Sequence, residues 1–199
     1  MSQFYHFPSD FFWTTKIKNH QGIKNNFLHQ IENDIKTLEK KPDWCCDVIS
    51  SFCYKKNFLY DNFLVNSIVW EPIDMMLSSF PNNYWQIKVP INSSISNIWY
   101  NYYNGTTSSH QEQHHHRPHS FSGIYFLKLN GKNTTTFYNY HSDTTFERRK
   151  ILDNVKEGDV VIFPSSLMHQ VNFFSGEKIS ISFNVSSTYS IEKKYKDNY

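Results

Sequence analysis

Two segments in the second half of the chain carry residues that could bind a metal ion. The first, HQEQHHHRPH at 110–119, contains His114 and His116, which lie two positions apart. Side chains at positions i and i+2 of a β-strand point to the same face, so one strand would project both imidazoles together. The second, VVIFPSSLMHQV at 160–171, supplies His169 from another predicted strand. Three imidazoles from two strands would hold one face of an octahedral metal ion and leave positions open for substrate and oxygen, as non-haem iron chemistry requires.

A lysine follows His169 by nine residues, at the start of the predicted strand KISISFN. Lys178 and Ser180 share strand parity and would therefore stand on one wall. An ammonium and a hydroxyl side by side can form charge-assisted hydrogen bonds to a carboxylate. The pair predicts an anchor for a carboxylate, and if a cosubstrate chelates the metal as a 2-oxo acid, its far carboxylate would reach this pair.

A carboxylate close to the histidines leaves two ligand sets open. Glu112 has the same strand parity as His114 and His116. In the register that the spacing favours, the two histidines are ligands. In another register, Glu112 would complete the metal shell and His116 would be spare.

The first half of the chain predicts elements that cover the metal-binding part from one side. The aromatic and β-branched run at 11–17 is typical of an edge strand. Apolar residues at helical spacing over 23–38 predict an amphipathic helix, which must cover an apolar surface. A second helix is expected within 61–80, where Pro72 either breaks the helix or opens its final turns.

After Pro81, helical periodicity gives way to short β-rich runs. Turn signals such as Asn104-Gly105 and Asn130-Gly131 separate them. Strands are predicted at 85–91, 97–103, 112–116, 122–129, 134–139, 159–163, 168–173 and 178–185. Many short strands at close spacing favour a sandwich or barrel. Together with the preceding helices, they predict a mainly β protein, a double-stranded β-helix (jelly roll) buttressed by N-terminal α-helices.

Composition fits a single β-rich domain. Aromatic residues make up 18% of the 199 residues, and large aromatic side chains suit the faces of a sandwich or barrel. We expect a helical N-terminal layer at 1–80, a jelly-roll core at 81–189 and a polar tail at 190–199. The net charge of only +2 argues against a nucleic-acid partner, which would call for a basic stripe.

The sequence also predicts a compartment. No run approaches the roughly 18 apolar residues that span a bilayer, so no membrane association is expected. The start, MSQFYHFPSD, lacks the basic and apolar regions of a signal peptide. The odd set Cys45, Cys46 and Cys53 fits reduced thiols. We therefore expect a cytoplasmic protein, in the host-cell cytoplasm if a phage encodes it.

Four segments resemble a known family, the small 2-oxoglutarate- and Fe(II)-dependent oxygenases of bacteria and phages. In that family, H-x-H precedes S-G-x-Y-Y, then F-P-S-x-L-x-H-x-V and R-I-S-I-x-F-N follow. The corresponding stretches here are WYNYYNG at 99–105, QEQHHHRPHSFSGIYFLK at 111–128, GDVVIFPSSLMHQV at 158–171 and KISISFN at 178–184. The resemblance implies hydroxylation of a substrate with release of succinate and CO₂.

The resemblance also implies roles for individual residues. The Fe(II) ligands would be His114, His116 and His169. The cosubstrate 2-oxoglutarate would be held by Lys178 and Ser180, with a further hydrogen bond from Tyr103.

Three departures from the family pattern are visible. The wider superfamily has His-x-Asp or His-x-Glu where this chain has His-x-His. Lys178 stands where arginine is usual, which replaces a two-pronged donor with a point charge. Phe126 replaces the second tyrosine of the Tyr-Tyr pair, and its position therefore offers no hydroxyl.

Two interpretations from other classes stay open at this level. The His-x-His pair also suits a three-histidine cupin-type metalloenzyme that does not use 2-oxoglutarate, although Lys178 and Ser180 argue against it. The aromatic content also allows a catalytically silent jelly-roll binding protein. If the chain is an oxygenase, its substrate is a small molecule or a peptidyl group. The aromatic stretch 99–103, with Phe121 and Tyr125, is expected to form the rim of the site, and 140–152 a lid or a surface loop.

Overall fold

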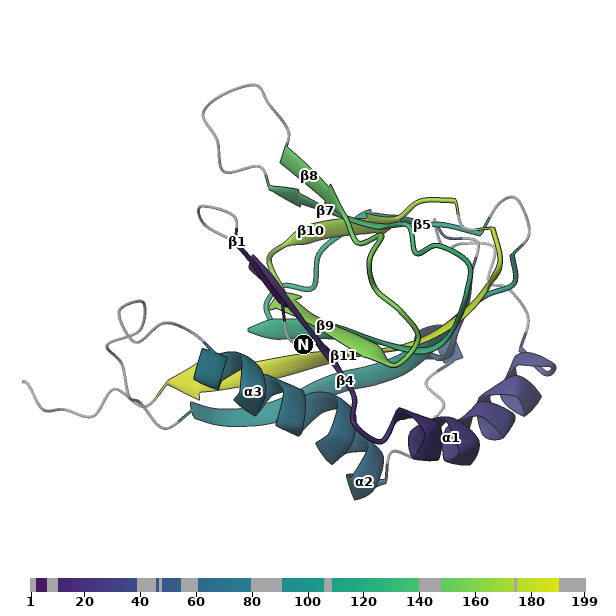
Figure 1. The fold of residues 1–199 in the computed structure, drawn as a ribbon, viewed down its shortest axis with the longest axis horizontal. Helices are drawn as coiled ribbons and strands as arrows, with labels where there is room; N and C mark the ends of the chain where they lie inside the picture. The colour runs from purple at the N-terminus through teal and green to yellow at the C-terminus, as the bar shows by residue number, and fades with distance from the viewer. Residues whose placement is uncertain are drawn as a thin grey trace, which may run out of the picture.

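The computed structural model describes residues 3–6, 11–38, 46, 48–54, 61–79, 91–105, 109–139, 148–173 and 175–189. Within these ranges two antiparallel β-sheets face each other, and helices cover the outer face of the larger sheet (Figure 1). This arrangement is the predicted mainly β jelly roll with an N-terminal helical buttress. The predicted strand 85–91 lies outside the described residues, apart from Ile91, where a strand begins. Of the segment 140–152, expected to be a lid or a surface loop, residues 140–147 also lie outside the described residues, whereas Arg148–Ile151 form a strand of the smaller sheet.

The larger sheet contains seven strands among the described residues. In spatial order they are β1 (Gln3–His6), β2 (Phe11–Lys16), β9 (Asp159–Pro164), β6 (Phe121–Asn130), β11 (Glu177–Tyr189), β4 (Ile91–Tyr103) and β3 (Ile49–Ser50). The smaller sheet has the order β5 (Gln111–His114), β10 (Met168–Val171), β7 (Thr135–Asn139) and β8 (Arg148–Ile151).

The prediction that the first strand lies at an edge is wrong. β2 pairs with β9 on one side, where Trp13 is the partner of Ile162, and with β1 on the other, where Thr14 is the partner of Gln3. The short β1 segment QFYH carries too few residues for a periodic signal. A four-residue strand is therefore easily missed in the sequence.

The helix α1 (His20–Ile35) confirms the amphipathic pattern. Ile23, Phe27 and Ile31 recur every four residues and are buried, so they form one stripe. The helix begins one turn before the predicted start and ends three residues before the predicted end.

The second predicted helix is continuous in path but changes its winding. It consists of α2 (Asn62–Val65), the π-helical turn η2 (Asn66–Trp70) and α3 (Glu71–Ser79). Pro72, the second residue of α3, has no backbone N–H to donate to the carbonyl four residues earlier. That carbonyl lies in the wider π-turn, where the usual ladder is already altered. Pro72 therefore does not break the helix. A short 3₁₀ turn, η1 (Ser51–Tyr54), precedes these elements.

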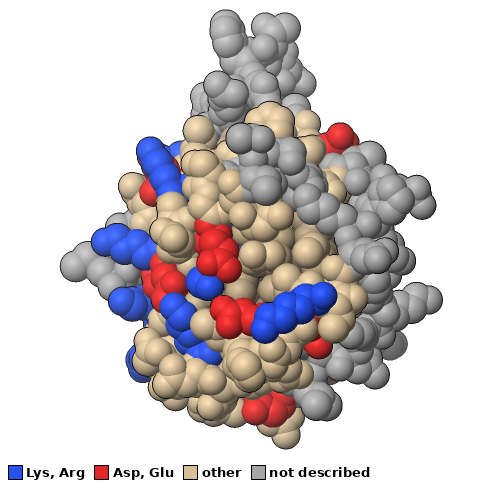
Figure 2. All heavy atoms as spheres, turned by 90° about the vertical axis from the view of Figure 1, so that its right-hand side faces the viewer, with Lys and Arg blue, Asp and Glu red and all other residues tan. Residues whose placement is uncertain are grey.

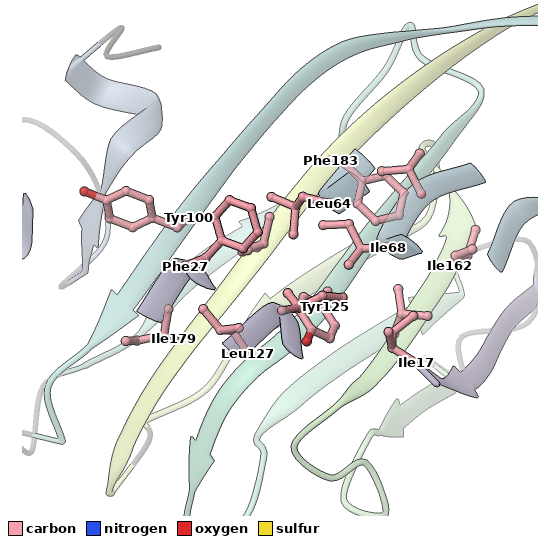
Figure 3. Packing of buried hydrophobic residues seen from close by; sticks show 14 of the residues in the cluster. Ile17, Phe27, Leu64, Ile68, Tyr100, Tyr125, Leu127, Ile162, Ile179 and Phe183 are labelled. Atoms are coloured by element: carbon pink, nitrogen blue, oxygen red, sulfur yellow. The ribbon is translucent and has the colours of Figure 1, made fainter. Parts of the chain in front are cut away.

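The main apolar core lies between the helices and the larger sheet (Figure 3). Phe27, Leu64 and Ile68 from the helices pack with buried sheet residues such as Tyr125 and Ile179. Burial of each large aliphatic or aromatic side chain contributes roughly 1.5–3 kcal/mol. This core fixes the helices as a backing layer, so the opposite face of the sheet is left for the space between the sheets.

Successive side chains of strand β11 point alternately to the two faces of the larger sheet. Ile179, Ile181 and Phe183 belong to the helix-facing core. The alternate residues, Lys178 and Ser180 among them, are also buried but line the space between the sheets. The period of two in a strand explains how one segment carries a core and a polar wall at once.

A second core fills one end of the space between the sheets. Phe137 of β7 stacks with Phe12 at 5.1 Å and meets Phe163 of β9 at 4.8 Å between ring centroids. Phe163 in turn lies 4.9 Å from the ring of His169. The apolar filling therefore ends at a histidine, and polar residues take over beyond it.

The packing around Gly123 explains why the sequence pattern has a glycine after its serine. A Cβ atom at this position would lie 2.0 Å from the ring of Phe183. The two residues are cross-strand partners on β6 and β11. The ring lies directly over the glycine, so any side chain there would displace it.

Charged residues of both signs are mixed on the surface. Lys128 of β6 pairs with Glu32 of α1 at 3.2 Å and with Glu177 of β11 at 2.8 Å. Figure 2 shows Lys and Arg interspersed with Asp and Glu on one face of the molecule. No single-sign stripe is visible on that face, which agrees with the small net charge. Within the described residues, no helix has both the length and the apolar character needed to cross a bilayer.

Candidate metal and cosubstrate site

Three histidine side chains meet between the sheets. His114, His116 and His169 each offer a ring nitrogen, and these nitrogens all lie within 4.8 Å of one another. The Nε2 atoms of His116 and His169 are 3.3 Å apart. The sequence predicted this meeting from the H-x-H pair and the later strand.

The path by which the histidines meet differs from the prediction. β5 ends at His114, so His116 lies beyond the strand and the two do not share strand parity. His114 is the cross-strand partner of His169, and the next pair is Gln111 with Val171. Between these two pairs, β5 has one more residue than β10, which is a β-bulge.

The bulge also determines where Glu112 points. It turns Gln111, rather than Glu112, to the inner face together with His114. The Glu112 side chain is exposed and is not part of the histidine cluster. The predicted shared parity of Glu112 and His114 is therefore wrong, because a period of two does not survive an inserted residue.

His116 is held through its main chain. Its N–H donates to the carbonyl oxygen of Ser165 at 2.8 Å, and its own carbonyl accepts from the N–H of His119 at 3.2 Å. Its ring lies 5.6 Å from that of Trp99 on β4. These contacts place the imidazole over the cluster without help from a strand.

Two of the imidazoles have a fixed tautomer. The Nδ1 atom of His114 lies 2.7 Å from the carbonyl oxygen of Glu112, and that of His169 lies 3.0 Å from the carbonyl oxygen of Leu167. A carbonyl only accepts, so Nδ1 carries the proton in both rings. Each Nε2 then presents its lone pair, which is the arrangement a metal ligand needs.

Burial keeps the imidazoles neutral. It lowers the pKa of His169 well below its usual value and that of His116 to about 3. Burial also lowers the pKa of His114. The neighbouring imidazoles act in the same direction, because a second positive charge nearby is unfavourable. Neutral imidazoles can bind a cation without first losing a proton.

The cluster opens into a cavity between the sheets. Besides the three histidines, its lining includes Trp99, Asn101, Tyr103, Lys178, Ser180 and Ser182. Among the described residues that line it, Lys178 is the one lysine or arginine, and none is a carboxylate. The cavity therefore suits an anion.

Lys178 lies in the cavity wall among polar and aromatic partners. Its side chain is 1% exposed. Its Nζ lies 4.0 Å from the centroid of the Tyr103 ring and donates to Oδ1 of Asn133 at 3.4 Å. Burial lowers the pKa of Lys178 to about 7. A carboxylate beside it would favour the charged form.

Ser180 and Tyr103 flank this lysine. Ser180 follows Lys178 on the same inner face, and Tyr103 is the cross-strand partner of Lys178. The Tyr103 hydroxyl donates to Oε1 of Gln111 at 3.2 Å. Burial raises the pKa of Tyr103, so the phenol keeps its proton and remains a donor.

Sequence reasoning missed Asn101, which lines the same wall. Its Nδ2 donates to the Ser182 hydroxyl at 3.3 Å. Its Oδ1 is buried and has no hydrogen-bond partner among the described residues. A buried acceptor of this kind costs free energy unless a ligand or water satisfies it. The signal was available in the sequence, because Asn101 has the strand parity of Trp99 and Tyr103.

The predicted aromatic rim is only partly correct. Trp99 and Tyr103 line the cavity. Tyr125 does not, because it belongs to the helix-facing core and its hydroxyl lies 2.6 Å from Nδ1 of His20. Phe121 packs against that same core, on the opposite side of the sheet from the cavity.

Three solved structures share this architecture. A prolyl hydroxylase from Trichoplax adhaerens, solved with a hypoxia inducible factor peptide fragment, has a TM-score of 0.57 at 12% identity. The match covers 88% of this chain and 83% of that one. A prolyl-4-hydroxylase from Pseudomonas putida has a TM-score of 0.54 at 10% identity, covering 88% and 91%. The non-heme α-ketoglutarate-dependent epimerase SnoN of nogalamycin biosynthesis has a TM-score of 0.58 at 9% identity, covering 89% and 79%. At these identities the likeness defines the fold, which is that of the double-stranded β-helix oxygenases.

Part of the sequence matches a known family. Residues 97–184 match a family described as "Putative 2OG-Fe(II) oxygenase". This segment contains the three clustered histidines and the Lys178–Ser180 pair. Over this segment the chain is similar to the 2OG-Fe(II) oxygenases, for which Fe(II) and 2-oxoglutarate are the implied cofactors. No curated protein sequence matches the chain significantly. The family match favours a 2-oxoglutarate-dependent enzyme over the cupin-type and silent alternatives.

Proposed function

We propose that this enzyme binds Fe(II) through His114, His116 and His169 and 2-oxoglutarate through Lys178, Ser180 and Tyr103. It would then hydroxylate a small-molecule or peptidyl substrate and release succinate and CO₂. The observation that carries the proposal is that one cavity contains both a cluster of neutral imidazoles and a buried lysine.

The histidine cluster fits a divalent iron ion. Two nitrogens at right angles around one ion, each bonded at about 2.1 Å, are about 3 Å apart. The Nε2 separation of 3.3 Å between His116 and His169 is close to this value. Three protein ligands would leave further coordination positions of the ion for a chelating cosubstrate and oxygen, which would bind in the cavity that the histidines share with Lys178.

The far end of the cavity fits a dicarboxylate. Lys178 offers a buried ammonium, and Ser180 offers a hydroxyl on the same face. Tyr103 covers the lysine with its ring. A carboxylate here would replace the long contact of 3.4 Å between Lys178 and Asn133 with a charge-assisted bond. The absence of carboxylates from the described lining removes competing anions.

Bound Fe(II) and 2-oxoglutarate would supply the oxidation: 2-oxoglutarate loses CO₂ to become succinate, and one oxygen atom of O₂ enters succinate and the other the substrate. The chain's own part is orientation and exclusion of water. Phe163 closes the cavity beside His169. Lys178 and Ser180 fix the direction of the cosubstrate, and Asn101 offers a further hydrogen-bond position on the same wall.

An aromatic pair suggests where the substrate enters. Phe52 of η1 is half exposed, and its ring lies 5.2 Å from that of Trp99. Trp99 also approaches the ring of His116. These rings lead from the surface to the histidine cluster, so we propose that an apolar part of the substrate packs on Phe52. We also place the enzyme in the cytoplasm, because the odd set Cys45, Cys46 and Cys53 fits reduced thiols, which a reducing compartment maintains.

The decisive experiment is anaerobic titration of the purified protein with Fe(II), followed by 2-oxoglutarate. We expect stoichiometric iron binding and a further spectral change when 2-oxoglutarate chelates the metal. On admission of oxygen, 2-oxoglutarate should turn over slowly to succinate even without substrate. Iron binding that does not respond to 2-oxoglutarate would contradict the cosubstrate assignment.

A further inference from the structure

Three buried polar residues form one hydrogen-bond network beside the histidine cluster. Ser122 of β6, Ser165 of the β9–β10 turn and Asn184 of β11 are 2%, 0% and 3% exposed. The Ser122 hydroxyl lies 2.7 Å from the Ser165 hydroxyl and 2.7 Å from Oδ1 of Asn184. All three belong to the motifs S-G, F-P-S and F-N that drew attention in the sequence, yet neither the metal nor the carboxylate anchor uses them.

The direction of these hydrogen bonds is fixed by chemistry. An amide oxygen only accepts, so Ser122 donates its single hydroxyl proton to Asn184. Ser122 must then accept from the Ser165 hydroxyl. Each proton in the chain is committed, and the Ser165 side chain is therefore held in one rotamer.

Ser165 connects this network to the third imidazole. Its carbonyl oxygen accepts from the N–H of His116 at 2.8 Å. Its own N–H donates to the carbonyl oxygen of Ser120 at 3.1 Å, and the N–H of Ser120 donates to Val185 at 2.9 Å. Main-chain hydrogen bonds thus join the turn that carries His116 to Ser165 at both of its ends and also to β11.

These hydrogen bonds are needed because His116 does not lie in a strand that could fix its position. His114 and His169 are cross-strand partners, so the sheet itself sets their separation. β5 ends at His114, and His116 depends on the 115–120 turn. A buried polar network that joins three elements can specify one position for such a turn.

We propose that Ser122, Ser165 and Asn184 are positioning residues that hold His116 in place for the metal. They act through the main chain of Ser165, and of the three only Ser122 also lines the cavity as described. The inference rests on the proposed function, because it assumes that His116 is a ligand.

The test uses the full chain and Co(II) as an air-stable probe of the iron site. Ser122→Ala removes the central link of the network. We expect Co(II) affinity to fall at least about tenfold, as for other residues that orient a metal ligand. The visible absorption of bound Co(II) should shift, because the third ligand is displaced. Ser79→Ala is the matched control, since the Ser79 hydroxyl donates to the carbonyl oxygen of Met76 at 2.7 Å within α3.

A double-mutant cycle separates positioning from general stability. In a His116→Ala background, Ser122→Ala should cause no further loss of Co(II) affinity, because the residue it positions is gone. An equal additional loss in that background would overturn the inference, as would unchanged affinity and spectrum in the single variant. If Ser122→Ala does not fold, Ser165→Ala removes only the outer hydroxyl and serves in its place.

The proposed metal site and the proposed positioning role can be refuted separately. Co(II) binding by the wild type that does not depend on His169 would defeat the proposed metal site itself. Binding that depends on His169 but not on Ser122 would defeat only the positioning role.

Discussion

The Nε2 atoms of His116 and His169 lie 3.3 Å apart, although one residue follows the end of β5 and the other lies within β10. A contact between two uncharged ring nitrogens has little to stabilise it unless a proton or a metal lies between them. Burial keeps both rings neutral, and in the neutral pair the Nε2–H tautomer of His116 donates to the bare Nε2 of His169. We propose that a metal ion takes the place of this proton and binds both nitrogens.

The first prediction concerns His169. His169→Ala should lower Fe(II) affinity by at least about 100-fold and abolish succinate formation, because removal of one of three ligands leaves the ion weakly held. Anaerobic metal titration measures the affinity, and circular dichroism checks the fold. His115→Ala is the control, since His115 is exposed between two of the ligands. Equal loss in both variants would mean that the region, and not the ligand, is responsible.

Glu112 provides a second prediction. Its side chain points outward, so Glu112→Ala should change Fe(II) affinity less than about twofold, within the range of exposed substitutions. His116→Ala should weaken binding strongly under the same conditions. The reverse order of the two effects would indicate that the carboxylate is the third ligand after all.

Lys178 should control 2-oxoglutarate binding. A hydrogen bond to a charged group contributes about 1.5–3 kcal/mol, and every 1.4 kcal/mol corresponds to about tenfold in affinity. We therefore expect Lys178→Ala to raise the apparent KM for 2-oxoglutarate about 10- to 150-fold while Fe(II) affinity is nearly unchanged. An unaltered KM would show that another residue holds the carboxylate. Lys178→Arg keeps the charge and should retain most of the affinity.

The same lysine predicts a pH dependence. Burial lowers its pKa to about 7, whereas only the protonated form attracts a carboxylate. Affinity for 2-oxoglutarate should therefore be full below pH 7 and fall by up to about tenfold per pH unit above it, until the pKa of the complex is reached. His116 and His169 stay neutral over this range and add no slope. Lys178→Arg should be flat between pH 6 and 9, because guanidinium does not titrate there.

The lowered pKa of this lysine also predicts how the free energy of unfolding depends on pH. The unfolded chain binds a proton at Lys178 up to its ordinary pKa, but the folded protein releases it near pH 7. Between these values the unfolded state holds more protons, so this residue adds stability as pH rises. In the absence of 2-oxoglutarate, wild type should gain stability relative to Lys178→Met from pH 7 towards 10, as measured by urea unfolding. A constant difference between the two proteins would contradict the lowered pKa.

Gly123 yields a prediction about the core. Gly123→Ala places a methyl group into the ring of Phe183 and should cost about 1–3 kcal/mol. For a domain of this size, each 1 kcal/mol lowers the Tm by about 2–4 °C. Gly22→Ala is the control, because its added methyl meets only the side chain of Asn19 and favours the α1 helix. Equal melting temperatures for the Gly123 variant and wild type would show that the ring moves aside freely.

The sequence was sufficient for most of the fold because its signals were periodic. The stripe of α1 and the alternation of β11 each repeat over many residues, so they survive errors in end points. β1 has only four residues, and its pairing with β2 depends on tertiary contacts that no local pattern records.

The site was predictable in its residues but not in its geometry. The spacing of His114, His116 and His169 indicated a cluster, and all three meet. The inferred route was wrong because a β-bulge in β5 leaves no trace in hydrophobic periodicity. Asn101 was missed for another reason: its strand parity with Trp99 and Tyr103 indicated the face on which it lies, but its unsatisfied oxygen is seen only in the folded chain.

The alternation along β11 restricts how this gene segment can change. Deletion or insertion of one residue between Lys178 and Asn184 would exchange the two faces of the strand. The isoleucines would then enter the anion cavity, and the lysine would be forced against the helices. A point substitution in this strand changes one face only, whereas a shift in length would remove both the core and the proposed cosubstrate anchor together.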